Sequence, residues 1–150
     1  MSKNVFEVKF TDPEGGVKLR SEILRPNGML PFSGIDGEYL DSSFTVGAFD
    51  KDKLVSIVTF IKDSNELFSQ KNQYIMRALV TDPDYRGQHA ASHVVEFGMN
   101  ELKKRGAELV WFKARVYAIP FYEKNGFETI GEEFMIPGIC MHKIMYKEVD

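Results

Sequence analysis

The sequence predicts one α/β domain over residues 1–150, built on a mixed sheet whose first part is antiparallel. A chain of 150 residues suits a single domain that buries about two-thirds of its unfolded surface. Three β-rich runs follow one another between residues 44 and 80, separated by polar spacers. After them, helical and strand patterns alternate, which is typical of crossover connections between strands.

The first half of the chain is predicted to contain one helix and four strands. Asp12 is an N-cap residue, Pro13 suits the first helical position, and the Pro26-Asn27-Gly28 triplet is a stop signal. The polar pair Lys51-Asp52 separates two β-rich runs and indicates a hairpin turn. We expect a helix at 17–24 and strands at 5–10, 44–50, 53–61 and 73–80. The aperiodic segment 29–43 is interpreted as a candidate substrate lid, because long loops in compact domains usually serve a site.

The second half alternates between helix and strand. Between Gln88 and Arg105 apolar side chains recur every three or four residues, and Gly106 is a stop signal. These apolar positions are Ala91, Val94, Val95, Met99 and Leu102. An almost wholly apolar run at 109–114 predicts an interior strand. A short helix at 118–125 and two strands at 127–134 and 139–149 complete the chain.

Composition excludes several classes of protein. A formal net charge of −3, without a block of like charges, argues against a protein that mainly neutralises nucleic-acid phosphates. The N-terminus lacks the apolar core of a signal peptide, and no apolar run has membrane length, so a cytoplasmic location without membrane association is expected. The single cysteine, Cys140, cannot form an intramolecular disulfide, and with His142 it lacks further close ligands, so no metal site is predicted.

The segment from Asp82 to Ala91 has the features of a phosphate-binding loop. The backbone N–H groups at the start of the following helix have no partner within that helix and favour an anion. They belong to Gln88, His89, Ala90 and Ala91. Arg86 adds a positive charge, and the small residue Gly87 allows a pyrophosphate to approach the backbone. The alternative is ordinary strand-to-helix punctuation, with the alanines packed against the sheet.

Residues 73–127 resemble the GNAT family of acetyl-CoA-dependent N-acetyltransferases. The family loop motif matches the stretch from Arg86 to Ala91, with His89 in place of the middle glycine. A second signature, Ala-x-x-Phe-Tyr-Glu-Lys-x-Gly-Phe, matches the stretch from Ala118 to Phe127. Lys113 stands where a bacterial subgroup of small GNAT proteins has an amide. The resemblance implies a three-layer α-β-α fold with a mostly antiparallel sheet of six to seven strands, whose central strands are splayed.

The resemblance also implies how acetyl-CoA is held and used. Backbone groups of Leu79 and Val80 are expected to pair with the pantetheine arm and to donate a hydrogen bond to the thioester oxygen. Tyr122, in the second signature, is expected to bind the cofactor and to act as the general acid that protonates the leaving thiolate. The alternative for Tyr122 is a core aromatic residue beside Phe121 and Phe127. The general base stays open among Asp36, Glu38, Glu128, Glu132 and His142, and a water relay would also serve.

The acceptor is expected to be the primary amine of a small molecule. Arg77 and Arg115 each interrupt or end an apolar strand, so we interpret them as partners for an acidic or amino-acid-like acceptor, or else for a carboxylate of the chain such as Glu38 or Glu133. Acetylation of a protein N-terminus or lysine, and non-catalytic binding of acyl-CoA, are the alternative functions. A homodimer through residues 139–146 is also considered, although core packing explains that apolar strand equally well.

Overall fold

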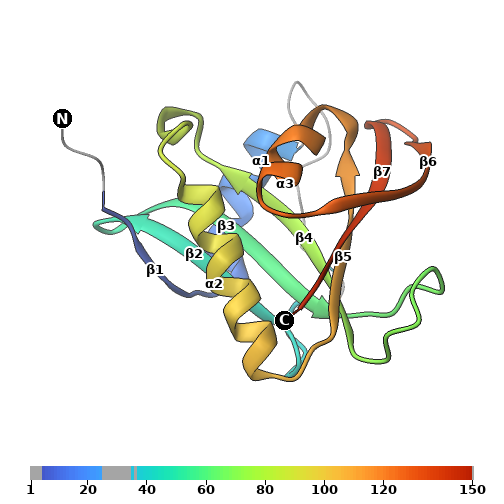
Figure 1. Ribbon diagram of the computed structural model, residues 1–150. Helices are drawn as coiled ribbons and strands as arrows, with labels where there is room; N and C mark the ends of the chain where they lie inside the picture. Colours follow the sequence, from blue (N-terminus) through green and yellow to red (C-terminus); the bar gives the residue numbers. More distant parts are fainter. Residues whose placement is uncertain (1–4, 25–34, 36, 150) are drawn as a thin grey trace. The chain divides into compact units, whose positions relative to one another are not determined.

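A computed structural model describes residues 5–24, 35 and 37–149, and Figure 1 shows how the chain runs through its elements. The strands form one seven-stranded mixed sheet in the order β1-β2-β3-β4-β5-β7-β6. The strands are β1 (Glu7–Phe10), β2 (Phe44–Asp50), β3 (Lys53–Lys62), β4 (Gln73–Thr81), β5 (Leu109–Arg115), β6 (Glu128–Ile136) and β7 (Cys140–Glu148). The helices are α1 (Val17–Leu24), α2 (Ala90–Lys104) and α3 (Ile119–Lys124), with 3₁₀ turns η1 (Pro13–Gly16), η2 (Pro83–Tyr85) and η3 (Val116–Ala118).

Contacts divide the chain into two compact units, and the chain passes from one unit to the other at the end of β3, within β4 and near the end of α2. The first unit comprises residues 1–62 and 76–101, and the second comprises 63–75 and 102–150. Strand β4 therefore begins in the second unit, where Gln73–Ile75 pair in parallel with Leu109–Trp111 of β5. The expected splay of β4 and β5 beyond these pairs, and the expected single domain, both concern the join between the units and stay predictions.

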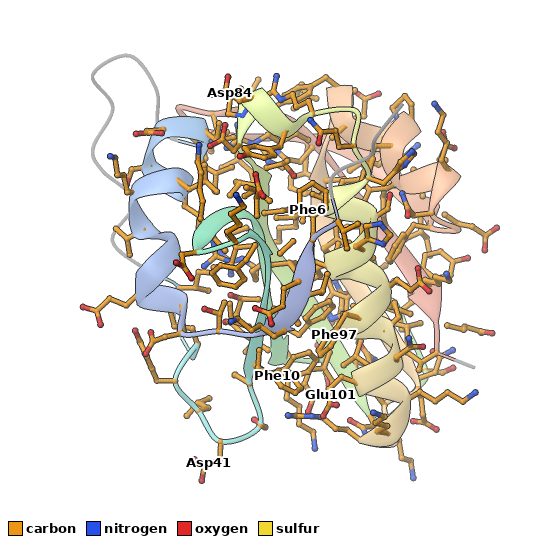
Figure 2. All side chains as sticks on the ribbon, turned by 90° about the vertical axis from the view of Figure 1, so that its left-hand side faces the viewer. Phe6, Phe10, Asp41, Asp84, Phe97 and Glu101 are labelled. Carbon is orange, nitrogen blue, oxygen red and sulfur yellow. The ribbon has the colours of Figure 1, made fainter. Side chains whose placement is uncertain are left out.

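In the first unit, the alternation of side chains along β3 separates two layers of packing. Ile57 faces α1, because it lies in one apolar cluster with Leu19 and would meet any side chain placed at Gly16. Phe60, which has the opposite parity, faces α2, where its ring fills the space beside Gly98. A strand turns successive side chains to opposite faces, so β3 carries a helix on each side. Figure 2 shows the same arrangement, with α1 and α2 on opposite sides of the strands.

Aromatic rings hold α2 against the first strands. Phe44 and Phe60 occupy opposite positions of the β2–β3 ladder and stack with their centroids 4.9 Å apart. Phe10 of β1 meets Phe97 of α2 edge to face at 5.2 Å, and Figure 2 shows these two side chains near one another. Pairs of this kind add about 0.5–1.5 kcal/mol beyond the area that they bury. The α2 side of the sheet is thus fixed by rings from three strands and the helix.

The second unit is built around β5 and β7. Strand β7 is paired antiparallel with β5 on one edge and with β6 on the other, so β6 ends the sheet. Both edges of β7 are paired within the sheet, whose outer strands are β1 and β6, so backbone pairing with a second copy of the chain would use one of these two strands. The expected interface at residues 139–146 stays a prediction. Near the start of β5, the Trp111 indole Nε1 donates to the Asp63 carbonyl oxygen at 3.0 Å. This bond ties the segment before β4 to the centre of the second unit.

The predicted order of elements is confirmed, with small shifts at their ends. Helix α1 has the predicted bounds, and Asp12 caps the turn before it by accepting from the Glu14 N–H at 2.8 Å. Helix α2 begins at Ala90 and not at Gln88, because His89 has a left-handed φ of 67° and cannot continue a helix. The predicted stop at Pro26-Asn27-Gly28, most of the candidate lid and Asp36 lie outside the described residues. None of the helices in the described ranges is long and apolar enough to cross a membrane.

Candidate active site

Strand β4 contains a backbone distortion at Ala78. Its φ is +54°, in the left-handed region that residues with a Cβ seldom adopt. Such a residue within a strand rotates the peptide groups around it, as in a β-bulge. Leu79 and Val80, which we expected to contact the cofactor, follow directly; Leu79 is partly buried and Val80 is buried. The cofactor-binding residues predicted on β4 therefore come directly after the distorted residue.

The buried arginine of α1 contacts this distortion. The Arg20 side chain is fully buried, and its Nε donates to the Ala78 carbonyl oxygen at 3.0 Å. Its Nη2 donates to the Thr59 hydroxyl at 2.9 Å, which is 2.8 Å from the hydroxyl of Thr45. Burial lowers the pKa of Arg20 to about 10, the Glu38 carboxylate acts to raise it, and Arg77 acts to lower it. The guanidinium is therefore charged at neutral pH.

The loop between β4 and α2 is anchored to the β2–β3 hairpin. The Tyr85 hydroxyl donates to Asp50 at 2.7 Å, and the Lys53 ammonium lies 3.4 Å from the Asp82 carboxylate. The Asp82 N–H also donates to the Val55 carbonyl oxygen at 2.7 Å. Asp82, the first residue of the loop, is thus joined to strand β3, and Tyr85, farther along the loop, is joined to the end of β2. The start of α2 is thus held on a rigid element, as a binding loop requires.

Two left-handed residues shape the loop immediately before α2. Gly87 has a φ of +78°, and a side chain at that position would meet no atom within 4 Å. His89 has a φ of +67°, so histidine adopts the conformation for which the family motif has glycine. Arg86, Gly87 and His89 are exposed, Gln88 is partly buried, and Ala90, the first residue of α2, is buried. Histidine in place of the family's glycine at position 89 therefore changes the side chain that the loop presents but keeps the backbone conformation of the loop.

Tyr122 lies in an aromatic cluster of the second unit. Its ring centroid is 4.4 Å from that of Phe112, 5.2 Å from that of Phe121 and 6.0 Å from that of Phe127. Burial raises the pKa of Tyr122 far above its ordinary value; nearby Tyr117 acts in the same direction, and the positive Arg115 opposes it. Among the described residues, the Tyr122 hydroxyl has no hydrogen-bond partner. The phenol is therefore protonated at neutral pH, and its hydroxyl is available to a ligand.

Arg115 and His142 share a position in the sheet of the second unit. They are directly opposite in the β5–β7 ladder, so their side chains lie on the same face. His142 is buried, its Nδ1 lies 2.8 Å from the Cys140 carbonyl oxygen, and its ring stacks on that of Phe134. Arg115 donates to the Tyr117 hydroxyl at 3.3 Å. The Nδ1 contact fits a tautomer in which that nitrogen carries the hydrogen.

The other polar residues named from the sequence differ in exposure. Glu38 is partly buried, and its Oε2 atom is buried without a hydrogen-bond partner among the described residues. Exposed side chains are found at Arg77, Lys113, Glu128, Glu132 and Glu133. Arg77 forms no ion pair within the described part of the chain, so a pairing with Glu38 is not present. Because Arg77 is exposed, the argument that a buried arginine needs a partner does not apply to it.

The candidate site residues fall into two sets, one in each unit. The first unit holds Arg77, Leu79 and Val80 on β4 and the loop from Arg86 to Ala91. The second unit holds Arg115, Tyr122 and His142. No group of three or more metal-ligating side chains occurs in the ranges that the structure describes.

Sequence reasoning missed the contact between Arg20 and Ala78. Its available signal was the position of Arg20 three and four residues before Ile23 and Leu24, on the apolar side of α1. The sequence contains no signal for the left-handed conformation of Ala78, because alanine is common in the apolar runs of both helices and strands.

Comparison with known proteins identifies the class. Residues 19–127 match the model of the acetyltransferase (GNAT) family. The chain is 33% identical over 143 residues to YitI of Bacillus subtilis strain 168, an uncharacterised N-acetyltransferase, and the match covers 95% of this chain and 96% of that protein. The protein therefore belongs to the GNAT family and is an acyl-CoA-dependent acetyltransferase.

Solved structures support the fold. The crystal structure of Escherichia coli ElaA superposes with a TM-score of 0.76 at 17% identity, over 96% of this chain and 100% of that one. An aminoglycoside 6′-N-acetyltransferase complexed with coenzyme A superposes with a TM-score of 0.69 at 15% identity, over 96% of this chain and 97% of that one. The mixed sheet with flanking helices is thus the fold of acyl-CoA N-acyltransferases.

Proposed function

We propose that the protein transfers the acetyl group of acetyl-CoA directly to the primary amine of a small molecule, with Tyr122 as the general acid. The observation that carries the proposal is the state of the Tyr122 phenol, which is protonated, packed among aromatic rings and without a hydrogen-bond partner among the described residues. A leaving thiolate needs a proton donor that has kept its proton until the C–S bond breaks. A phenol with a raised pKa meets that requirement at neutral pH.

The reaction balances with the groups that the chain provides. The amine nitrogen attacks the thioester carbonyl carbon, a C–N bond forms, and the C–S bond breaks. Coenzyme A leaves as a thiolate that takes the proton of Tyr122, while the proton lost by the amine goes to a general base. During attack, negative charge develops on the carbonyl oxygen, and we assign the Leu79 N–H as its donor. The loop from Arg86 to Ala91 is assigned to the pyrophosphate, because it combines a helix N-terminus with the positive charge of Arg86.

Among the base candidates we favour Glu38. Its buried Oε2 has no hydrogen-bond partner among the described residues, and a buried carboxylate oxygen left unpaired costs about 1–3 kcal/mol or more. An ammonium or amine N–H of the acceptor would satisfy it. Glu38 also acts on the pKa of Arg20, whose Nε contacts the Ala78 carbonyl oxygen, so the three groups lie in one region of the first unit. Glu128 and Glu132 are exposed and lack this need for a partner.

The proposed acceptor carries an acidic group that binds Arg77 or Arg115. Exposed Arg77 forms no ion pair in the described part of the chain, which leaves its guanidinium available to a carboxylate. A panel of amines with and without a carboxylate, assayed by release of free coenzyme A thiol, tests this class. Arg77→Ala is expected to raise the KM of a carboxylated amine about tenfold and to leave that of an uncharged amine unchanged. An unchanged KM for both amines would exclude Arg77 as the contact.

Tyr122→Phe tests the central role. The variant keeps the ring and its packing and removes only the hydroxyl, so acetyl-CoA binding measured by calorimetry should persist. The turnover number with the best amine of the panel should fall by about 10²–10³-fold, within the range of general-acid contributions. Tyr117→Phe is the matched control, because Tyr117 lies nearby but is exposed. Equal turnover of Tyr122→Phe and the wild type would remove Tyr122 from the mechanism.

A further inference from the structure

The contact between Arg20 and Ala78 fixes the direction of one peptide group. The Ala78 carbonyl oxygen accepts from Arg20 Nε at 3.0 Å, and the described chain contains no cis peptide bond. In a trans peptide the C=O and N–H bonds point in opposite directions. Because the Ala78 carbonyl is held toward Arg20, the N–H of Leu79 in the same peptide points away from Arg20. That N–H is the oxyanion donor of the proposed function.

The arginine is itself held in place. Its guanidinium is fully buried and donates through Nη2 to Thr59, which pairs with Thr45 across the β2–β3 ladder. A second bond along β4 has the same form, since the Ser56 hydroxyl donates to the Val80 carbonyl oxygen at 3.0 Å. Side chains thus bind the carbonyl groups on both sides of Leu79. Burying a charged group costs free energy. The use of one donor of the buried guanidinium on a single distorted peptide therefore calls for a functional explanation.

We propose that Arg20 is a positioning residue that fixes and polarises the Ala78–Leu79 peptide, so that the Leu79 N–H is aimed at the thioester oxygen before the substrate binds. The proposal rests on the proposed function, because it concerns the oxyanion donor of that reaction. A charge-assisted bond to the carbonyl draws electron density toward the oxygen and strengthens the N–H of the same peptide as a donor. It also opposes relaxation of the left-handed Ala78, whose conformation costs on the order of 1–3 kcal/mol. Arg20 itself does not touch the substrate.

Two substitutions of equal length separate this role from simple structural support. Glutamine carries its Nε2 at the same place along the side chain as arginine Nε, so Arg20→Gln can still donate to the Ala78 carbonyl oxygen. Arg20→Met has a side chain of the same length without a donor. Both variants lose the charge and the Thr59 contact, so both should lose a similar amount of stability. Thr59→Val removes the hydroxyl that accepts from Nη2, together with its bond to Thr45, and leaves the contact of Arg20 with Ala78.

The experiment measures turnover and the carbonyl stretch of bound acetyl-CoA labelled with ¹³C at the thioester. A hydrogen bond from the Leu79 N–H to the thioester oxygen should lower that stretching frequency in the wild type, compared with a thioester that accepts no hydrogen bond. Arg20→Met should reduce the lowering and reduce kcat about 10- to 100-fold relative to Arg20→Gln, whereas the KM for acetyl-CoA stays within about twofold. Thr59→Val keeps the Nε bond to the Ala78 carbonyl oxygen, so it should lose less of the lowering and less turnover than Arg20→Met. Unfolding of each variant in urea confirms that all four proteins are compared as folded molecules.

Two results would overturn the inference in different ways. A wild-type stretch that is lowered, and stays equally lowered in Arg20→Met and Arg20→Gln with equal kcat, would show that Arg20 does not position the peptide while the oxyanion donor stands. A wild-type stretch equal to that of acetyl-CoA's thioester in an aprotic solvent, where the oxygen accepts no hydrogen bond, would overturn the oxyanion assignment of the proposed function, and with it the role of Arg20.

Discussion

The rings of Phe112 and Tyr122 lie with their centroids 4.4 Å apart and their planes inclined by 54°. Phe112 comes from the interior of β5 and Tyr122 from α3, so this contact sets the short helix on the strand. Phe127 closes the cluster, edge to face with Phe112 at 5.1 Å. The apolar rings withdraw the phenol from water, and this desolvation is the largest cause of its raised pKa. Packing that looks structural thus sets the protonation of the proposed acid.

The raised pKa of Tyr122 predicts how stability depends on pH. In the unfolded chain the phenol titrates near its ordinary pKa of about 10, whereas in the folded protein it keeps its proton to higher pH. Below pH ~10 both states are protonated and stability is unaffected. Above that pH the unfolded state loses the proton first, so the free energy of unfolding falls by up to about 1.4 kcal/mol per pH unit from this group.

The measurement is urea unfolding of the wild type and Tyr122→Phe between pH 7 and pH 11. The difference between the two proteins isolates Tyr122 from the other tyrosines, which titrate in both. The wild type should lose stability relative to Tyr122→Phe only above pH ~10. Parallel curves over the whole range would mean that the folded phenol titrates like the unfolded one.

Glu38 carries the second prediction. Glutamine has the same shape as glutamate but cannot take a proton from the attacking amine, so Glu38→Gln should lower kcat by about 10²-fold. Glu133→Gln is the matched control, because Glu133 is exposed. The measurement is kcat for both variants with the best amine of the panel. Equal kcat in the wild type and Glu38→Gln would return the choice to His142 or to a water relay.

The loop residue His89 carries the third prediction. At a φ of +67°, glycine pays no penalty for its conformation, whereas alanine keeps the Cβ that makes this region unfavourable. His89→Gly should therefore be more stable than His89→Ala by about 1 kcal/mol, measured as the difference in free energy of unfolding. His89→Ala as stable as His89→Gly would contradict the left-handed assignment.

The same pair separates the backbone of the loop from its imidazole. If only backbone N–H groups hold the pyrophosphate, His89→Gly keeps the wild-type affinity for acetyl-CoA in calorimetry. A similar loss of affinity in both variants would show that the imidazole itself contacts the cofactor.

The sequence allowed prediction where residue type and local conformation agree. The Asp12-Pro13 start of the first helix, the alternation along β3 and the signature around Tyr122 are local patterns, and the structure has the elements that they predicted. The role of Arg20 could not be read in this way, because its partners Thr59 and Ala78 are 39 and 58 residues away along the chain. Alanine has no intrinsic preference that would reveal the left-handed conformation of Ala78.

The interior of α2 carries the last prediction. In an exposed helix, replacing glycine with alanine gains about 1 kcal/mol, because glycine loses more backbone entropy on folding. At Gly98 an added Cβ would collide with the ring of Phe60, which is fully buried and stacked on Phe44 at 4.9 Å. The ring cannot move away without disturbing that stack, and overpacking of a core costs about 1–3 kcal/mol.

The collision therefore outweighs the gain in helix propensity, and Gly98→Ala should lower the free energy of unfolding by about 1–2 kcal/mol in urea. Asn100→Ala, at an exposed position of the same helix, is the control and should change stability by less than about 0.7 kcal/mol. Phe60→Leu should make room for the methyl group, so the double variant should be more stable than the sum of the single losses, with a coupling of about 1 kcal/mol. Additive losses would mean that Gly98 and Phe60 do not meet.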